Sequence, residues 1–86
     1  MATVKLRAPL RDLAGGQTQV KLDGDTVGEV IRSLERTYPR LTGWILDEQG
    51  QVRQHVNVFL NGERIKEGAK LQPDDVIHVL PSISGG

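Results

Sequence analysis

The sequence contains no cysteine, and its 86 residues include only one tryptophan, one tyrosine and one phenylalanine. Without cysteine the chain has no disulfide framework, no thiol nucleophile and no thiolate ligand for a metal. It also lacks any apolar stretch close to the roughly 20 residues that span a bilayer, and its first residues do not form the apolar core of a signal peptide. We therefore expect a cytoplasmic protein that folds by packing alone and has no membrane partner.

Long runs of like charge are missing as well. Eleven Lys and Arg residues balance eleven Asp and Glu residues, so the formal net charge is zero. A basic patch is the usual footprint of nucleic-acid binding, and this even mixture of charges does not predict one. At 86 residues the chain makes one small domain with a single modest core, and we do not expect nucleic acid as its partner.

Motifs for catalysis, metal binding and phosphate binding are also missing. His55 and His78 each stand alone, whereas a metal site needs three or four ligands. Paired carboxylates such as Asp74 and Asp75 adjoin residues typical of turns, where Asp ordinarily bonds to nearby backbone N–H groups. Glycine-rich phosphate-binding fingerprints are absent, and so is a serine nucleophile elbow. We expect no catalytic residue, no metal and no bound cofactor in the chain itself.

Alternation of apolar and polar residues predicts strands near both ends of the chain. Residues 3–8 and 18–22 alternate and predict an opening hairpin. Residues 55–60 form the next predicted strand, and Asn61-Gly62 predicts a tight turn into a further one. Residues 76–80 are nearly all apolar, as in a strand inside a sheet, especially a parallel one.

One amphipathic helix is predicted between these pairs of strands. Thr26 begins a capping box with the glutamate three residues later, and apolar residues then recur at intervals of three and four until Pro39 ends the helix. Gly28 either approaches the sheet closely or is tolerated in the first turn, and we favour tolerance. Residues 41–54 are a connection with a short turn of helix or strand. The pattern predicts an α+β domain over residues 1–80, with a mixed sheet of four to five strands and one main helix packed on one face.

The chain ends in Gly85 and Gly86, after a short tail. Two glycines in succession give a slim backbone and leave the terminal carboxylate unshielded, which suits chemistry inside another protein's active site. Fully extended, residues 82–86 reach about 17 Å. A frayed terminus is the alternative interpretation. The predicted flexible tail consists of Pro81, Ser82, Ile83, Ser84, Gly85 and Gly86, and Gly86 is the predicted reactive residue.

Three segments carry a resemblance to a known family. They are residues 25–31, residues 56–62, and residues 74–81 followed by the Gly-Gly end. Together they resemble the ubiquitin-like sulfur carriers, the MoaD, ThiS and CysO proteins with a β-grasp fold. The resemblance implies that a ubiquitin-activating-like enzyme uses ATP to adenylate the Gly86 carboxylate. Sulfur then replaces AMP, and the resulting thiocarboxylate donates sulfur in biosynthesis.

The ending of the chain is closest to the CysO-like group. That branch implies sulfur delivery for cysteine synthesis, with a cysteine synthase-like enzyme as acceptor. Residues 41–54 are the kind of insertion seen in MoaD-like and CysO-like members, so a MoaD-like small subunit bound to a molybdopterin synthase large subunit is an alternative. A second alternative is a ubiquitin-like modifier joined through Gly86 to lysines of other proteins, and a third is an interaction module with an inert tail.

A partner surface is predicted from the period of two in strands. If Ile77 and Val79 face the helix, the residues that alternate with them face the other way. We expect these residues to form an exposed apolar patch with a basic border, which would be a docking site for the activating enzyme. The alternative is that the 41–54 connection covers part of this face. The predicted partner-binding residues are Val76, His78, Leu80, Phe59, Arg7 and Arg64.

Overall fold

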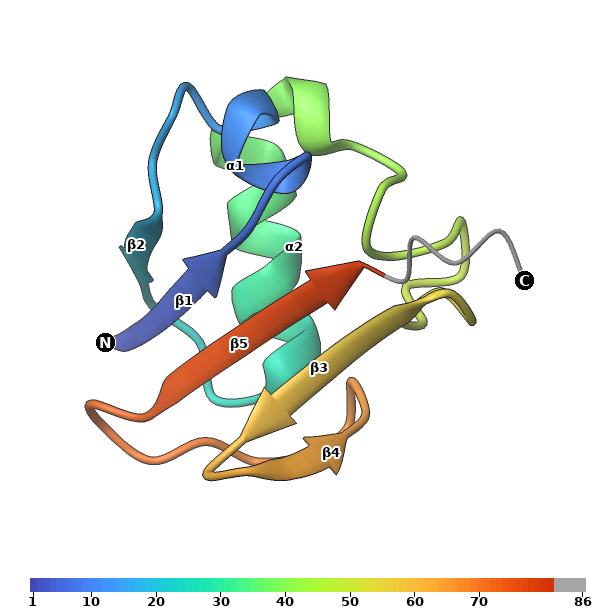
Figure 1. The fold of residues 1–86 in the computed structure, drawn as a ribbon. Coiled ribbons are helices and arrows are strands. Elements are labelled where there is room, and N and C mark those ends of the chain that lie inside the picture. The colour runs from blue at the N-terminus through green and yellow to red at the C-terminus, as the bar shows by residue number, and fades with distance from the viewer. Residues whose placement is uncertain (82–86) are drawn as a thin grey trace.

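The protein is built on one five-stranded mixed sheet, which confirms the predicted fold class (Figure 1). The computed structural model describes residues 1–81, and the strand order is β2-β1-β5-β3-β4. The central strands β1 and β5 run parallel, and all other neighbours are antiparallel. The strands are β1 (Ala2–Leu6), β2 (Gln19–Leu22), β3 (Val56–Leu60), β4 (Glu63–Ile65) and β5 (Val76–Pro81).

The position of β5 explains its nearly continuous apolar sequence. It pairs with β1 on one side and with β3 on the other, so it lies inside the sheet, as predicted. Ile77 and Val79 are fully buried on the core side, whereas Val76 and His78 are only half-buried. Both faces of this strand therefore carry apolar side chains, but only one face belongs to the core.

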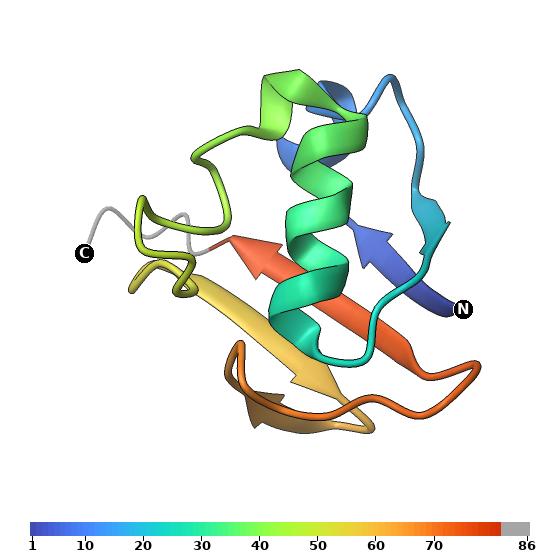
Figure 2. The same cartoon turned by 180° about the vertical axis from the view of Figure 1, so that it is seen from behind.

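Helix α2 (Val27–Thr37) crosses one face of the sheet (Figures 1 and 2). Its N-terminus is capped as predicted, because the Thr26 hydroxyl accepts a hydrogen bond of 3.2 Å from the Glu29 N–H. In a capping box the glutamate accepts a hydrogen bond from the N–H of the capping residue, which here is Thr26. In this structure the Glu29 carboxylate instead accepts a hydrogen bond of 2.7 Å from the N–H of Asp25, one residue earlier. The buried stripe of the helix consists of Val27, Val30, Ile31 and Leu34.

Gly28 lies in close contact with another segment, so the interpretation of simple tolerance is wrong. Its N–H donates a 2.8 Å hydrogen bond to the Glu67 carbonyl, and a Cβ at this position would lie 3.1 Å from the same oxygen. The close neighbour is the turn after β4 and not the sheet itself. The absence of a side chain lets this turn reach the first turn of α2.

A short helix in the first connection, α1 (Leu10–Leu13), was not predicted. The first strand ends at Leu6 and not at residue 8, and Ala8 is exposed instead of sharing the core face. Leu10 and Ala14 are buried, so this single turn closes one end of the core. Four residues are too few for helical periodicity to stand out in a sequence.

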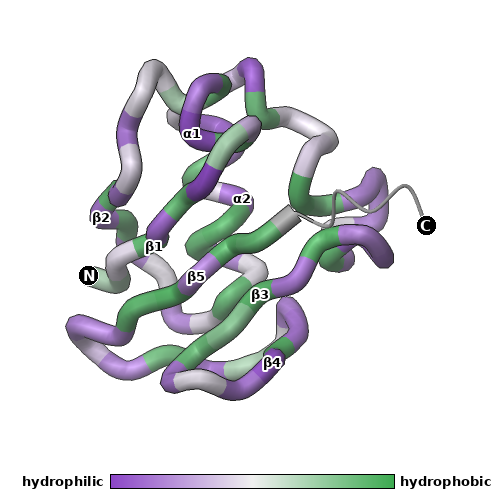
Figure 3. The backbone as a smooth tube through the Cα atoms, in the orientation of Figure 1, coloured by the Kyte–Doolittle hydropathy of each residue, from purple (hydrophilic) through white to green (hydrophobic). Residues whose placement is uncertain are grey.

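The connection between α2 and β3 contributes to the core. It begins with the 3-10 helix η1 (Pro39–Leu41), and Leu41, Ile45 and Leu46 are buried in the same cluster as the sheet and helix residues. Figure 3 shows the apolar residues concentrated along β1, β5, β3 and α2, with polar residues at the turns. The connection therefore lies on the helix side of the sheet, where it packs into the core and contacts α2. It does not cover the opposite face, which carries the predicted partner surface.

Candidate functional site

The predicted tail begins where the sheet ends. Pro81 is the last residue of β5 and pairs with Val56 at the start of β3. The remaining predicted tail residues, 82–86, lie outside the described residues, and the boundary between domain and tail stays a prediction, as does the role of Gly86. Pro81, the last described residue, lies beside β3.

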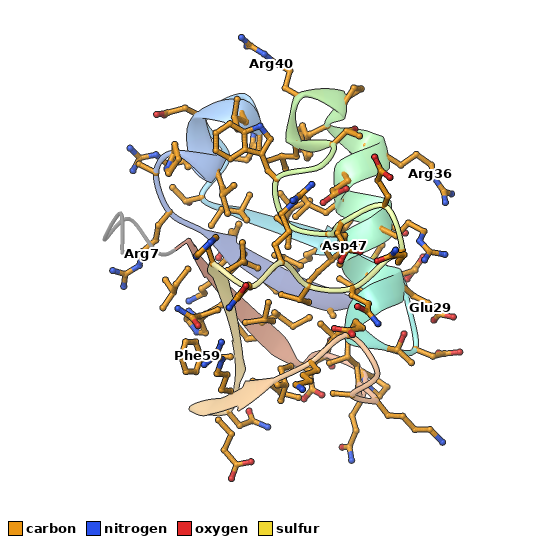
Figure 4. The ribbon with its side chains drawn as sticks, turned by 90° about the vertical axis from the view of Figure 1, so that its right-hand side faces the viewer. Arg7, Glu29, Arg36, Arg40, Asp47 and Phe59 are labelled. Carbon is orange, nitrogen blue, oxygen red and sulfur yellow. The ribbon has the colours of Figure 1, made fainter. Side chains whose placement is uncertain are left out.

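The face of the sheet away from α2, here called the outer face, carries one row of side chains across all five strands. Residues directly opposite one another in neighbouring strands share a face. Figure 4 shows Arg7 and Phe59 projecting on the side away from Glu29 and Arg36 of α2. The pairing places Gln19, Lys5, His78, Phe59 and Arg64 in this row, from β2 to β4.

The predicted partner-binding residues share this outer face, as the alternation indicated. Val76, His78 and Leu80 alternate with the buried residues of β5, and His78 is opposite Phe59. Arg64 ends the row beside Phe59. The side chains of Phe59 and of the three β5 residues are half-buried, so part of each is open to a partner. The strand pairing gives their positions, while their role in binding stays a prediction.

A shallow hollow on the outer face adds a basic feature to this patch. It has a volume of about 340 Å³ and lies between β1, β2 and β5. Lys5, Arg7 and His78 line it together with Leu80, and no acidic side chain does. Such a hollow favours a carboxylate from a partner, held by charge-assisted hydrogen bonds.

The strands present basic side chains on the outer face. The strand pairing places Lys5, Lys21 and Arg64 on the outer face and places no Asp or Glu there. Lys5 and Lys21 were missing from the predicted site, although the alternation in residues 3–8 and 18–22 puts them on the polar side of their strands.

Among residues 1–81, no polar or charged residue is fully buried, and no group of three or more His, Asp or Glu side chains is arranged to hold a metal ion. Within the same residues, no helix is long and apolar enough to cross a membrane.

The model of the ThiS family matches residues 4–86. The chain belongs to the ThiS family. Among the relatives of this ThiS family member is small archaeal modifier protein 1 of Haloferax volcanii, which is 36% identical over 84 residues, covering 95% of this chain and 97% of that protein. Sulfur carrier protein CysO of Mycobacterium tuberculosis is 32% identical over 90 residues, covering 98% and 97% of the two chains.

Solved structures agree with this family membership. A chain in the crystal structure of the BexX/CysO complex of Amycolatopsis orientalis has a TM-score of 0.89 and 27% identity, and each chain is covered over 100% of its length. The arrangement of five strands and one main helix is thus the β-grasp fold of the ubiquitin-like sulfur carriers and modifiers.

Proposed function

We propose that this ThiS family protein is a sulfur carrier whose reactive group is the carboxylate of Gly86. The observation that carries the proposal is a Gly-Gly end a few residues beyond β5, in a chain that matches CysO over 98% of its length. The sulfur then enters a biosynthetic product, and cysteine is the product that the CysO likeness favours. The final acceptor of the sulfur is accordingly a cysteine synthase-like enzyme.

The chemistry follows from the properties of a terminal carboxylate. A carboxylate is a poor electrophile, so one of its oxygens first attacks the α-phosphorus of ATP, and pyrophosphate leaves. A hydrosulfide ion then attacks the carbonyl carbon of the acyl-adenylate, the bond from that carbon to the phosphate oxygen breaks, and AMP leaves. Loss of the remaining proton from the sulfur leaves Gly86 with a thiocarboxylate, which is itself a sulfur nucleophile. ATP belongs to the activating enzyme, and we place both proteins in the cytoplasm, where ATP is available.

The folded domain provides the surface by which the activating enzyme binds the chain. In our proposal the activating enzyme docks on the outer face, with the apolar strip of Phe59 and Leu80 at the centre of the contact. Arg7 and Arg64 border the strip and pair with carboxylates of the enzyme. An apolar centre with a polar rim is the usual composition of a protein interface. The chain is then a protein substrate, and the catalytic groups belong to its partners.

A second function is favoured by one specific observation. The relative that is 36% identical is named a small archaeal modifier protein. A modifier uses the same acyl-adenylate of Gly86, but the amino group of a lysine on another protein finally attacks the carbonyl carbon and forms an isopeptide bond. Both functions need the same tail and the same activating enzyme, and they differ in the nucleophile.

One experiment in cells separates these functions. The gene is deleted in the source organism, and the strain is complemented with the wild-type chain or with a chain lacking Gly86. A carrier predicts that growth requires added cysteine, and that only the wild-type chain removes the requirement. Conjugates of the chain on other proteins, with no requirement for cysteine, would instead support the modifier.

A further inference from the structure

The connection between α2 and β3 is fixed by a carboxylate on the helix. Glu35 of α2 accepts hydrogen bonds from the backbone N–H groups of Gly43, Ile45 and Leu46, at 3.3, 3.2 and 2.8 Å. Hydrogen bonds to an ionised acceptor are roughly twice as strong as those between neutral groups. Three of them on one side chain hold the first half of this connection in a single conformation.

A second carboxylate holds the other half. The Val52 N–H donates a 3.1 Å hydrogen bond to the Glu67 carboxylate, and Val52 also pairs with Leu46 in an isolated bridge. The Nε of Arg53 donates to the carbonyl of Gly43 and so ties the two ends of the connection together. A loop held by this many hydrogen bonds is ordered before any partner arrives, and so it avoids part of the entropic cost of binding.

This ordered connection presents an exposed tryptophan. Trp44 is 46% exposed, although the next two residues are buried in the core. Among residues 1–81, the only other large apolar side chain of comparable exposure is Met1 at the N-terminus. Tryptophan is enriched at the energetic centres of protein interfaces, because a rigid ring buries a large area at a small entropic cost.

A basic groove lies beside the second half of the connection. It has a volume of about 560 Å³ and separates residues 51–54 from residues 64–67. Arg53, Arg64 and Lys66 contribute positive charge to its lining, and the one acidic residue, Glu67, already accepts the Val52 N–H. Apolar side chains complete the lining, namely Val52, Val56 and Ile65.

The groove lies at the end of the sheet from which the tail departs. Val56 lines the groove and pairs with Pro81, the last described residue. Residues 82–86 span at most about 17 Å when extended. An enzyme that acts on Gly86 must therefore bring its surface within this distance of Pro81, close to the groove.

We propose that residues 42–55 of the connection between α2 and β3 form a second docking element for the adenylating enzyme, which adjoins the outer face at Arg64. Its occupant is an acidic segment of that enzyme that also carries apolar side chains, with its carboxylates in the groove and an apolar side chain against Trp44. The inference rests on the proposed function, because it assumes that such an enzyme acts on the tail. An apolar lining with three cations fits a protein segment better than a nucleic acid, which needs a larger basic surface.

The single tryptophan gives a direct test of contact. The chain is produced with 5-fluorotryptophan, so that its ¹⁹F spectrum contains one resonance, from position 44. Unlabelled adenylating enzyme is added with ATP and magnesium. We expect the chemical shift of the resonance to change as enzyme is added, whereas line broadening alone would follow from slower tumbling of any complex. A chemical shift that stays unchanged while the chain is being adenylated would overturn the proposal.

Kinetics of pyrophosphate exchange test the charge of the occupant. We expect Trp44→Ala to raise the KM for the carrier about tenfold or more, and Lys66→Glu about fivefold, with kcat unchanged in both. Lys70→Glu is the matched control, because Lys70 is exposed but does not line the groove. Equal effects of Lys66→Glu and Lys70→Glu, or none from Trp44→Ala, would contradict the proposal.

These outcomes are distinguishable from failure of the proposed function. If the wild-type chain supports no pyrophosphate exchange with any activating enzyme, the carrier function itself is wrong. If the wild-type chain is adenylated normally and the variants behave like it, the second docking element alone is wrong. The ¹⁹F measurement uses no substitution that removes the indole, so it decides the question even if Trp44→Ala destabilises the fold.

Discussion

At the scale of single residues, alternation along the strands predicted most of the outer face. Leu80 and His78 were placed correctly because their neighbours on β5, Ile77 and Val79, are fully buried. Trp44 was not recognised as a candidate, because its exposure depends on how the connection folds and not on a repeating pattern. Residue positions within regular elements could thus be predicted, whereas those within the connection could not.

Replacement of Leu80 by aspartate tests docking at the outer face. The aspartate places a negative charge in a basic patch and removes apolar contact area, so we expect the KM for the carrier to rise at least tenfold in pyrophosphate exchange. Leu80 is half-buried on the side away from the core, so the melting temperature should change little. Gln17→Asp, at an exposed position in the loop before β2, is the control. Wild-type kinetics for Leu80→Asp would contradict outer-face docking.

Replacement of Gly24 by alanine tests a close contact between this residue and the first turn of α2. A Cβ at this position would lie 2.6 Å from Cγ2 of Val30 and 2.9 Å from its backbone nitrogen. We expect Gly24→Ala to lower the free energy of unfolding by roughly 1–3 kcal/mol, as overpacking does. The control is Gly68→Ala, where a Cβ would meet no atom within 4 Å. Urea denaturation measures both, and equal stabilities for the two variants would refute the contact.

At the scale of elements, local signals succeeded where an element is long and regular. Helix α2 has a cap, a buried stripe and a proline after its end, and all three are visible in the sequence. Helix α1 has four residues and no capping side chain, so it gave no signal. The connection is ordered by Glu35 and Glu67, which lie outside it in sequence, and no local pattern encodes such bonds.

Removal of the Glu35 carboxylate tests whether its hydrogen bonds hold the connection in place. Glu35→Ala leaves three backbone N–H groups without their acceptor, so we expect the free energy of unfolding to fall by roughly 2 kcal/mol. Glu48→Ala, at an exposed position inside the connection, should change it by less than about 0.5 kcal/mol. Hydrogen exchange should also accelerate at Gly43, Ile45 and Leu46 in the Glu35 variant alone. Equal behaviour of the two variants would show that Glu35 does not hold the connection.

At the scale of the whole molecule, the fold and the proposed chemistry are separate. The core cluster joins the sheet, α2, α1 and the connection. Gly86, the proposed reactive residue, lies five residues beyond the last strand residue, Pro81. The α+β architecture and the outer face could be predicted from alternation and element order, and the β-grasp fold from the family resemblance. The acceptor of the sulfur could not, because its identity depends on surfaces of other proteins.

This separation predicts the effect of shortening the chain. A variant without Gly86 should keep the melting temperature and the urea midpoint of the wild type, because the residue is not part of the described core. The same variant should support no pyrophosphate exchange or sulfur transfer, because its terminal carboxylate ends one residue short of the reacting position. Loss of stability would show that the tail contributes to the fold.

The most direct test of the central claim is the intact mass of the protein after incubation with ATP, sulfide and its activating enzyme. The account predicts an increase equal to the replacement of one oxygen by one sulfur, and no increase in the variant without Gly86. The account is contradicted if the wild-type mass stays unchanged while the enzyme is active and the acyl-adenylate forms.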